Sequence, residues 1–181
     1  MKKILFMAIA LMSAIASFGQ ISAQDWTDSD GNAWKVYAFS NAQIFARVQI
    51  DNYLGKYYNV QVLVSNESGN PITLDPSTMT ASVVKKGKST SLKVYDHDSY
   101  VKAIKARNSA ANLGSVIGGG GTQEVNTASI DKFYIQNKEV ANGEQYLGMV
   151  NIEYKGGDML VYTLSVLGAE YTFEFDVKKL K

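Results

Sequence analysis

The chain has 181 residues, a formal net charge of +1 and no cysteine. The missing thiols exclude disulfides, thiolate metal sites and cysteine nucleophiles, so stability must come from an apolar core. The nearly balanced charge argues against nucleic acid as a partner, because nucleic-acid-binding domains usually carry a marked basic excess.

The N-terminus has the pattern of a secretory signal peptide. Two lysines follow Met1, and the run Ile4–Ala16 is almost entirely apolar but too short to span a bilayer comfortably. We expect cleavage after Ala23, with Gly19 as the second choice, and a single exported domain over residues 24–181. A retained N-terminal anchor is the alternative. The expected location is the periplasm or the cell surface, with no transmembrane segment after signal removal.

Alternation of apolar and polar residues with a period of two predicts strands in the first half of the mature chain. The clearest inner face is formed by Tyr58 and the valines that follow it at every second position. Turn-forming residues separate the runs, as at Asp30-Gly31 and Asp75-Pro76-Ser77. The predicted strands are Trp34–Phe39, Ile44–Ile50, Tyr58–Val64, Met79–Val84 and Ser91–Tyr95.

A helical pattern replaces the alternation after Asp98-Ser99. Apolar residues recur at intervals of three and four, which predicts a helix to about Asn112, capped by Asp98 or Ser99. The run Gly118–Gly121 then predicts a flexible return loop, because glycine loses much backbone freedom on ordering. The predicted insertion covers about residues 96–121.

We give equal weight to two roles for this insertion. In the first, it carries a partner-binding surface, because loops on a rigid scaffold often carry function. In the second, its apolar side plugs one open end of the sandwich. The basic residues favour an acidic protein surface or an anionic envelope polymer as the partner. The candidate contact residues are Tyr100, Lys102, Lys105 and Arg107.

Three further strands are predicted near the C-terminus, and we expect them to form an antiparallel meander. Gly156-Gly157 suits a type I′ turn and Gly168-Ala169 suits a type II′ turn. In the last strand, alternation directs Phe173 inward and Glu174 outward. The predicted strands are Tyr146–Tyr154, Met159–Leu167 and Glu170–Val177.

His97 is the single histidine, so every histidine-based mechanism depends on Asp96-His97-Asp98. Neighbouring side chains diverge along a strand, so we expect a strand-to-helix junction with capping acids. The segment Asp28–Asn32 resembles part of a calcium loop but lacks its first and last ligands, which favours a hairpin turn. Gly118–Gly121 lacks the lysine of a phosphate-binding loop. The sequence thus predicts no catalytic residue, metal site or cofactor.

Two other functions stay open at this point. Because Tyr58 points inward in the predicted strand, Tyr57 and the nearby Tyr53 are candidates for stacking on sugar rings, as in a carbohydrate-binding module. A hydrolase that uses only carboxylates is the further alternative, because 17 acidic residues allow many pairs and none stands out.

Short motifs add a family resemblance: Tyr58–Asn66, Asp75–Ser77, and Gly143-Glu144 before Leu147–Val150. They resemble the telokin-like, immunoglobulin-fold domains of small exported bacterial proteins, in which a hydrophobic strand ends in an asparagine-containing turn and a Gly-Glu turn precedes a Gly-x-Val strand. The resemblance covers most of Val60–Val177 and implies a fold and an export route, with no established reaction.

We therefore predict a mainly β, immunoglobulin-like antiparallel β-sandwich with one helix and a Gly-rich loop inserted near the middle. The expected function is that of a noncatalytic exported binding module without a cofactor, whose partner is a protein or an envelope polymer.

Overall fold

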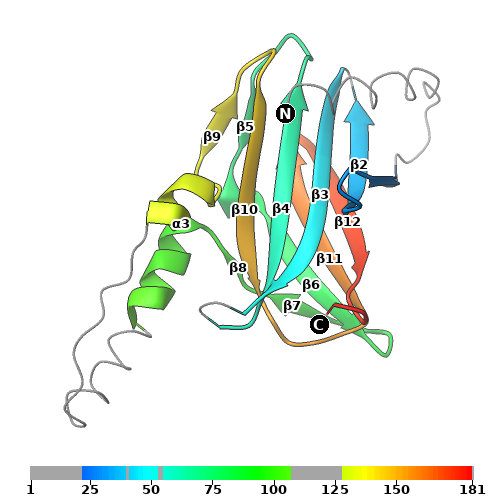
Figure 1. Ribbon diagram of the computed structural model, residues 1–181, viewed down its shortest axis with the longest axis vertical. Helices are drawn as coiled ribbons and strands as arrows, with labels where there is room; N and C mark the ends of the chain where they lie inside the picture. The colour runs from blue at the N-terminus through cyan, green and yellow to red at the C-terminus, as the bar shows by residue number, and fades with distance from the viewer. Residues whose placement is uncertain (1–21, 40, 53–54, 107–127, 181) are drawn as a thin grey trace.

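The computed structural model describes residues 22–39, 41–52, 55–106 and 128–180. These residues form a mainly β structure in which two antiparallel sheets face each other, with short helices beside them (Figure 1). The larger sheet has the strand order β1-β2-β3-β4-β10-β8, and the smaller sheet has the order β12-β11-β6-β7. A separate pair, β5 and β9, lies between them at one side of the molecule.

The bounds of the elements follow the turn residues of the sequence. The larger sheet contains β1 (Gln24–Thr27), β2 (Ala33–Phe39), β3 (Ala42–Asp51), β4 (Tyr57–Asn66), β8 (Val94–Tyr95) and β10 (Gln145–Glu153). The smaller sheet contains β6 (Thr80–Lys85), β7 (Lys88–Leu92), β11 (Met159–Val166) and β12 (Ala169–Asp176). The remaining elements are β5 (Ile72–Leu74), the 3-10 helix η1 (Pro76–Thr78), a helix at residues 97–106, α3 (Ala128–Phe133) and β9 (Lys138–Val140).

The core lies between the two sheets and confirms the predicted inner faces. Tyr58 is 1% exposed, and the valines at every second position after it are fully buried. From the opposite sheet, Phe173 is fully buried while Glu174 is exposed, as the alternation predicts. Because each inner face is continuously apolar, burial of these side chains is the main source of stability in a chain without disulfides.

The predicted C-terminal meander is only partly correct. β11 and β12 form a hairpin, but β10 pairs with β4 and β8 and makes no ladder with β11. The chain between β10 and β11 therefore crosses from one sheet to the other. A Cβ on Gly157 would collide with the side chain of Val83 on β6, so this glycine lets the chain that leads into β11 lie close to β6 and does not form the predicted turn.

Two hairpins of the smaller sheet use type I′ turns, of which one was expected one residue later and the other was not predicted. The β11–β12 turn consists of Leu167 and Gly168, with φ of 51° and 77°, so it starts one residue before the predicted type II′ turn. Lys86 and Gly87, with φ of 50° and 76°, join β6 to β7 in the same way. The predicted strand Ser91–Tyr95 is divided between β7, which pairs with β6, and β8, which pairs with β10 in the larger sheet.

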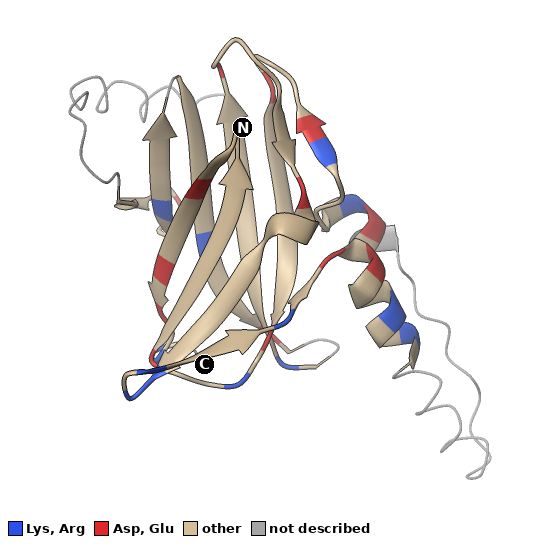
Figure 2. Cartoon of the chain, turned by 180° about the vertical axis from the view of Figure 1, so that it is seen from behind, with Lys and Arg blue, Asp and Glu red and all other residues tan. Residues whose placement is uncertain are grey.

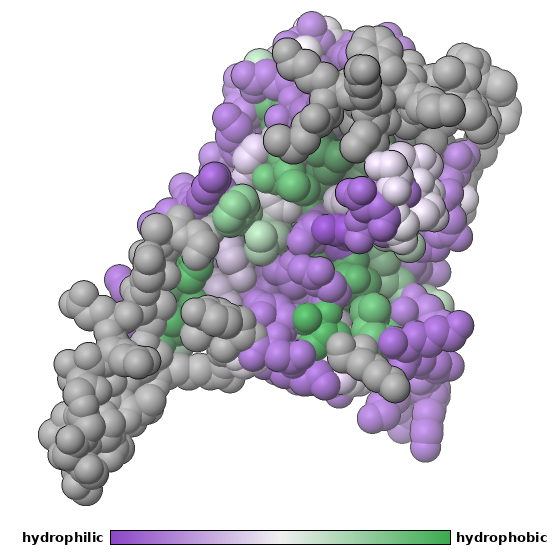
Figure 3. Space-filling view, in the orientation of Figure 1, coloured by the Kyte–Doolittle hydropathy of each residue, from purple (hydrophilic) through white to green (hydrophobic). Residues whose placement is uncertain are grey.

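The outer face of the larger sheet is mixed in polarity (Figure 3). Beside β1 and β2, Trp34, Val36 and Phe45 form a small buried cluster with Trp26 and Leu63 packed against it. These side chains cover part of the outer face of the larger sheet by packing against one another.

In the view from behind, the strands of the smaller sheet carry few charges, whereas the helices carry charges of both signs (Figure 2).

Asn66 joins two loops at one end of the sandwich. Its side chain is fully buried, and its Nδ2 donates to the carbonyl oxygens of Asn70 at 2.7 Å and Val140 at 2.9 Å. Its Oδ1 accepts from the Ser68 hydroxyl at 2.7 Å, and its carbonyl accepts from the Gly143 N–H. These hydrogen bonds connect the asparagine-containing turn after β4 with the Gly-Glu turn before β10, and we call this connection the Asn66 joint.

One side of the sandwich is closed beside β10. Ile135 is fully buried in the main core, and its N–H donates to the Met149 carbonyl at 2.9 Å. A Cβ on Gly148 would lie 2.5 Å from Ile135 Cγ1, so only glycine leaves room for this side chain. The contact fixes the segment that follows α3 against the sheet.

The core assignment leads to a stability prediction. Phe173→Ala should lower the free energy of unfolding by roughly 3 to 5 kcal/mol, because it removes a buried aromatic ring from the space between the sheets. The neighbouring Glu174→Ala should change it by less than about 0.5 kcal/mol, because Glu174 is exposed. Urea unfolding followed by tryptophan fluorescence measures both, and equal losses would contradict the assigned inner face.

Candidate functional site

The helix at residues 97–106 and α3, together called the helical layer, lie beside β10 and β8 at the edge of the larger sheet (Figure 1). They attach through an apolar cluster separate from the sandwich core. Its buried members are Tyr57, Tyr100, Ile104, Ile130 and Tyr134. The helix at residues 97–106 confirms the predicted helix within the described residues. It packs on the sheet through this cluster and not through the sandwich core. The predicted Gly-rich loop, like the last part of the predicted helix, falls outside the described residues.

The tyrosines of this cluster pack closely. The rings of Tyr100 and Tyr134 stack with centroids 4.6 Å apart and planes 12° from parallel, and Tyr57 meets Tyr100 edge to face at 5.5 Å. Burial raises the pKa of Tyr100 and of Tyr134 above the usual tyrosine range. Their hydroxyl groups consequently stay protonated at physiological pH.

A chain of buried amides forms the floor beneath the helical layer. Asn59 is 2% exposed and Asn151 is fully buried, although both lie on the outward side of their strands. Asn59 Nδ2 donates to Asn151 Oδ1 at 2.8 Å, and Asn151 Nδ2 donates to Asp51 Oδ2 at 3.4 Å. Gln49 Nε2 donates to Asn59 Oδ1 at 3.3 Å. Sequence alternation gave no sign of this floor, because outward polar residues on a strand normally face water.

The structure corrects two of the sequence-based site residues. Tyr57 is 6% exposed and Tyr100 is 2% exposed, so neither ring forms an open surface. Tyr57 does point away from the sandwich core as alternation predicts, but the helical layer covers that side. Tyr53, the other tyrosine of the predicted sugar-stacking pair, falls outside the described residues. The described member of the pair, Tyr57, is thus buried.

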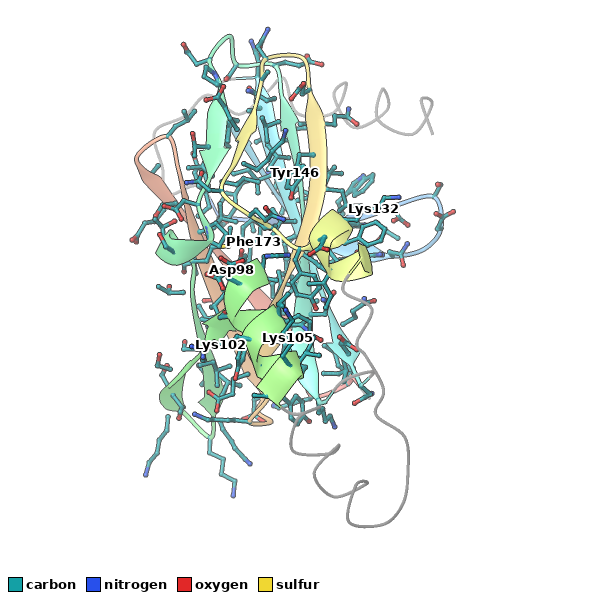
Figure 4. All side chains as sticks on the ribbon, turned by 90° about the vertical axis from the view of Figure 1, so that its left-hand side faces the viewer. Asp98, Lys102, Lys105, Lys132, Tyr146 and Phe173 are labelled. Carbon is teal, nitrogen blue, oxygen red and sulfur yellow. The ribbon has the colours of Figure 1, made fainter. Side chains whose placement is uncertain are left out.

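The basic candidates have a different placement. Lys102 and Lys105 are exposed on the helix opposite its buried residues, and Lys132 is exposed on α3. Figure 4 looks directly at the helical layer and labels all three lysines. Arg107 lies outside the described residues. These lysines give the helical layer exposed positive charge, beside the exposed carboxylates of Asp98 and Asp131.

His97 has two carboxylate partners, contrary to the expectation of diverging neighbours. Its Nδ1 lies 2.7 Å from Asp98 Oδ1, and its Nε2 lies 2.7 Å from Asp131 Oδ1 on α3. The expected strand-to-helix junction is present, because β8 ends at Tyr95 and the helix begins at His97. The divergence of neighbouring side chains was wrongly expected, because at the start of a helix a neighbouring side chain can turn back to the ring. The cap is Asp96, whose Oδ1 accepts from the Ser99 N–H at 2.7 Å, and not the predicted Asp98 or Ser99.

A polar pocket of about 320 Å³ opens next to this histidine. Its lining residues are Asp75, Pro76, Ser77, Asp96, His97, Asp98, Ile135, Gln136 and Asn137. Asp75 accepts from the Ser77 N–H at 2.9 Å, and hydrogen bonds to Ser77 lower the pKa of Asp75. Asp75 and Asp96 thus hold local backbone turns. Within the described residues, no group of three or more acidic or histidine side chains could hold a metal ion.

No protein-family model matches the chain, and neither does any curated protein or solved structure. The site itself is therefore the basis for any functional conclusion. The described part of the chain contains no helix with the length and hydropathy of a membrane span.

The calcium-like segment forms the hairpin turn that the sequence favours. Asp28 Oδ2 accepts from Trp34 Nε1 at 3.0 Å, and Asp28 Oδ1 accepts from the N–H groups of Asp30 and Asn32. These bonds, with the Trp34 indole contributing most, lower the pKa of Asp28 to about 2. Its carboxylate is therefore used to hold the β1–β2 turn.

The buried amide floor leads to a prediction. Asn151→Ala removes the amide acceptor of the buried Asn59 Nδ2 beneath the helical layer, so it should cost about 1 to 3 kcal/mol of unfolding free energy. Asn52→Ala is the control, because Asn52 is exposed and should tolerate the change within about 0.5 kcal/mol. Equal urea midpoints for the two variants would show that the floor is solvated.

The Asp28 turn should respond to acid. A lowered carboxyl pKa contributes stability that is present above the unfolded value of 3.8 and is lost as the pH falls through about 2. The indole N–H resonance of Trp34 should therefore shift with a midpoint near pH 2 in wild type. The transition should disappear in Asp28→Asn, and a wild-type midpoint near 4 would contradict the assigned hydrogen bonds.

Proposed function

We propose that the protein is a noncatalytic, exported binding module with an immunoglobulin-like sandwich as its scaffold. In this proposal, the exposed basic side of the helix at residues 97–106 contacts an anionic macromolecule, either an acidic protein surface or an envelope polymer. The N-terminal pattern of two lysines and an apolar run supports export of the domain.

The observation that carries the proposal is the two-sided character of this helix. Tyr100 and Ile104 attach it to the sheet, while Lys102 and Lys105 remain exposed one turn apart. The sandwich core contains no member of the apolar cluster that holds the helix. Connecting segments held on a rigid scaffold often carry binding residues, and this helix belongs to the connection between β8 and β9.

The neighbouring groups support binding over catalysis. The carboxylates of Asp75 and Asp96 accept hydrogen bonds from backbone N–H groups, and Asp98 contacts His97. Such bonds are typical of capping residues that fix local structure. The burial of Tyr57 also removes one of the two rings, Tyr53 and Tyr57, on which the carbohydrate-binding alternative depended.

Charge reversal tests the proposed surface. The double variant Lys102→Glu/Lys105→Glu should bind poly-L-glutamate about tenfold more weakly than wild type at low salt, because two exposed attractions become repulsions. Titration calorimetry at two salt concentrations measures the affinity. For wild type, the affinity should fall as salt rises.

A matched variant controls for net charge. Lys85→Glu/Lys88→Glu makes the same charge change on the exposed β6–β7 hairpin of the opposite sheet, and it should bind nearly as wild type does. Thermal unfolding of both variants confirms that they are folded. If the two double variants lose the same affinity, binding is not localised to the helix and the proposed surface is wrong.

A further inference from the structure

We propose that His97 is a pH-dependent latch between the two helices of the helical layer. In its charged form, the imidazolium holds Asp131 of α3 against the start of the helix at residues 97–106. Loss of one proton weakens this connection and loosens α3. This inference concerns the protein's own conformation and is independent of the partner proposed above.

The geometry requires a charged ring. Each ring nitrogen of His97 lies 2.7 Å from a carboxylate oxygen, Asp98 on one side and Asp131 on the other. An ionised carboxylate only accepts hydrogen bonds, so both nitrogens must donate, and only the imidazolium has two N–H groups. A neutral ring would direct a lone pair at one of the carboxylates at the same distance, which is repulsive.

The latch joins elements that are distant in the sequence. Asp98 is the neighbour of His97, whereas Asp131 belongs to α3, 34 residues along the chain. α3 has six residues, a length at which a helix has little stability of its own. Its apolar attachments include the buried Ile130 and, just after it, Tyr134 and Ile135. The charge-assisted bond of His97 adds a pH-dependent attachment to these apolar ones.

The charged surroundings favour the imidazolium. Besides Asp98 and Asp131, Asp96 and Asp75 line the pocket on the side of His97, together with the uncharged Ser77, Gln136 and Asn137. The exposed cations of the layer are Lys102, Lys105 and Lys132. Hydrogen bonds to Asp98 and then to Asp131 raise the pKa of His97 against a smaller opposing effect of burial.

The direction of the pH dependence follows from this raised pKa. The stabilisation is fully present below the unfolded value of 6.5 and is lost as the pH rises through the higher folded value. The latch is therefore closed below the raised pKa of His97 and opens as the pH rises above it.

The single histidine makes the first test unambiguous. Proton NMR of the full chain should show one imidazole titration, with a midpoint above 6.5 in wild type and a lower midpoint in Asp131→Asn. Asp25→Asn, on β1 at the opposite edge of the sheet, should leave the midpoint unchanged. A wild-type midpoint at or below 6.5, or an equal midpoint in Asp131→Asn, would overturn the latch.

Amide hydrogen exchange then tests the movement of α3. After correction for the intrinsic rate, protection of residues 128–133 in wild type should fall about threefold to fivefold between pH 6 and pH 9, as expected for one partly exposed charge pair. In His97→Gln, which cannot become charged, protection should be low and equal at both pH values. Unchanged protection in wild type, or the same pH dependence in His97→Gln, would refute the proposal.

Discussion

The antiparallel pairing of β4 with β10 is the constraint on which the rest of the molecule depends. It runs from Ser65↔Gln145 to Tyr57↔Glu153 and brings the last third of the chain against its first half. The inward side chains of the two strands line the sandwich core, and the outward side chains of Tyr57, Asn59 and Asn151 lie under the helical layer. The sandwich and the helical layer therefore share two strands, and neither is complete without this pairing.

Much of the sandwich could be predicted from sequence because a strand with one wet face displays its burial as a period of two. The inward positions of Tyr58 and Phe173 follow from that pattern and are correct. The choice of partner strand does not follow from it, since the pattern specifies a face and not a neighbour. For that reason Gly156-Gly157 resembled a hairpin turn, although it lies on a crossing between sheets.

The helical layer was harder to predict because it breaks the assumption of a wet outer face. Tyr57 and Asn151 point outward and are nevertheless buried, since helices distant in the sequence cover them. The contact of His97 with Asp131 spans 34 residues and leaves no local pattern. The Asp28 turn was predictable, because all of its hydrogen bonds lie within six residues along the chain.

The buried Asn66 joint has a consequence for producing the protein. Asn66-Glu67-Ser68 matches the acceptor pattern for N-linked glycosylation, and the amide nitrogen that would carry the sugar is the one that donates to Asn70 and Val140. In a eukaryotic secretory pathway, the modifying enzyme would meet this nitrogen before the joint closes. A glycan attached there could not enter the fully buried site, so sugar attachment and folding would compete for the same atom.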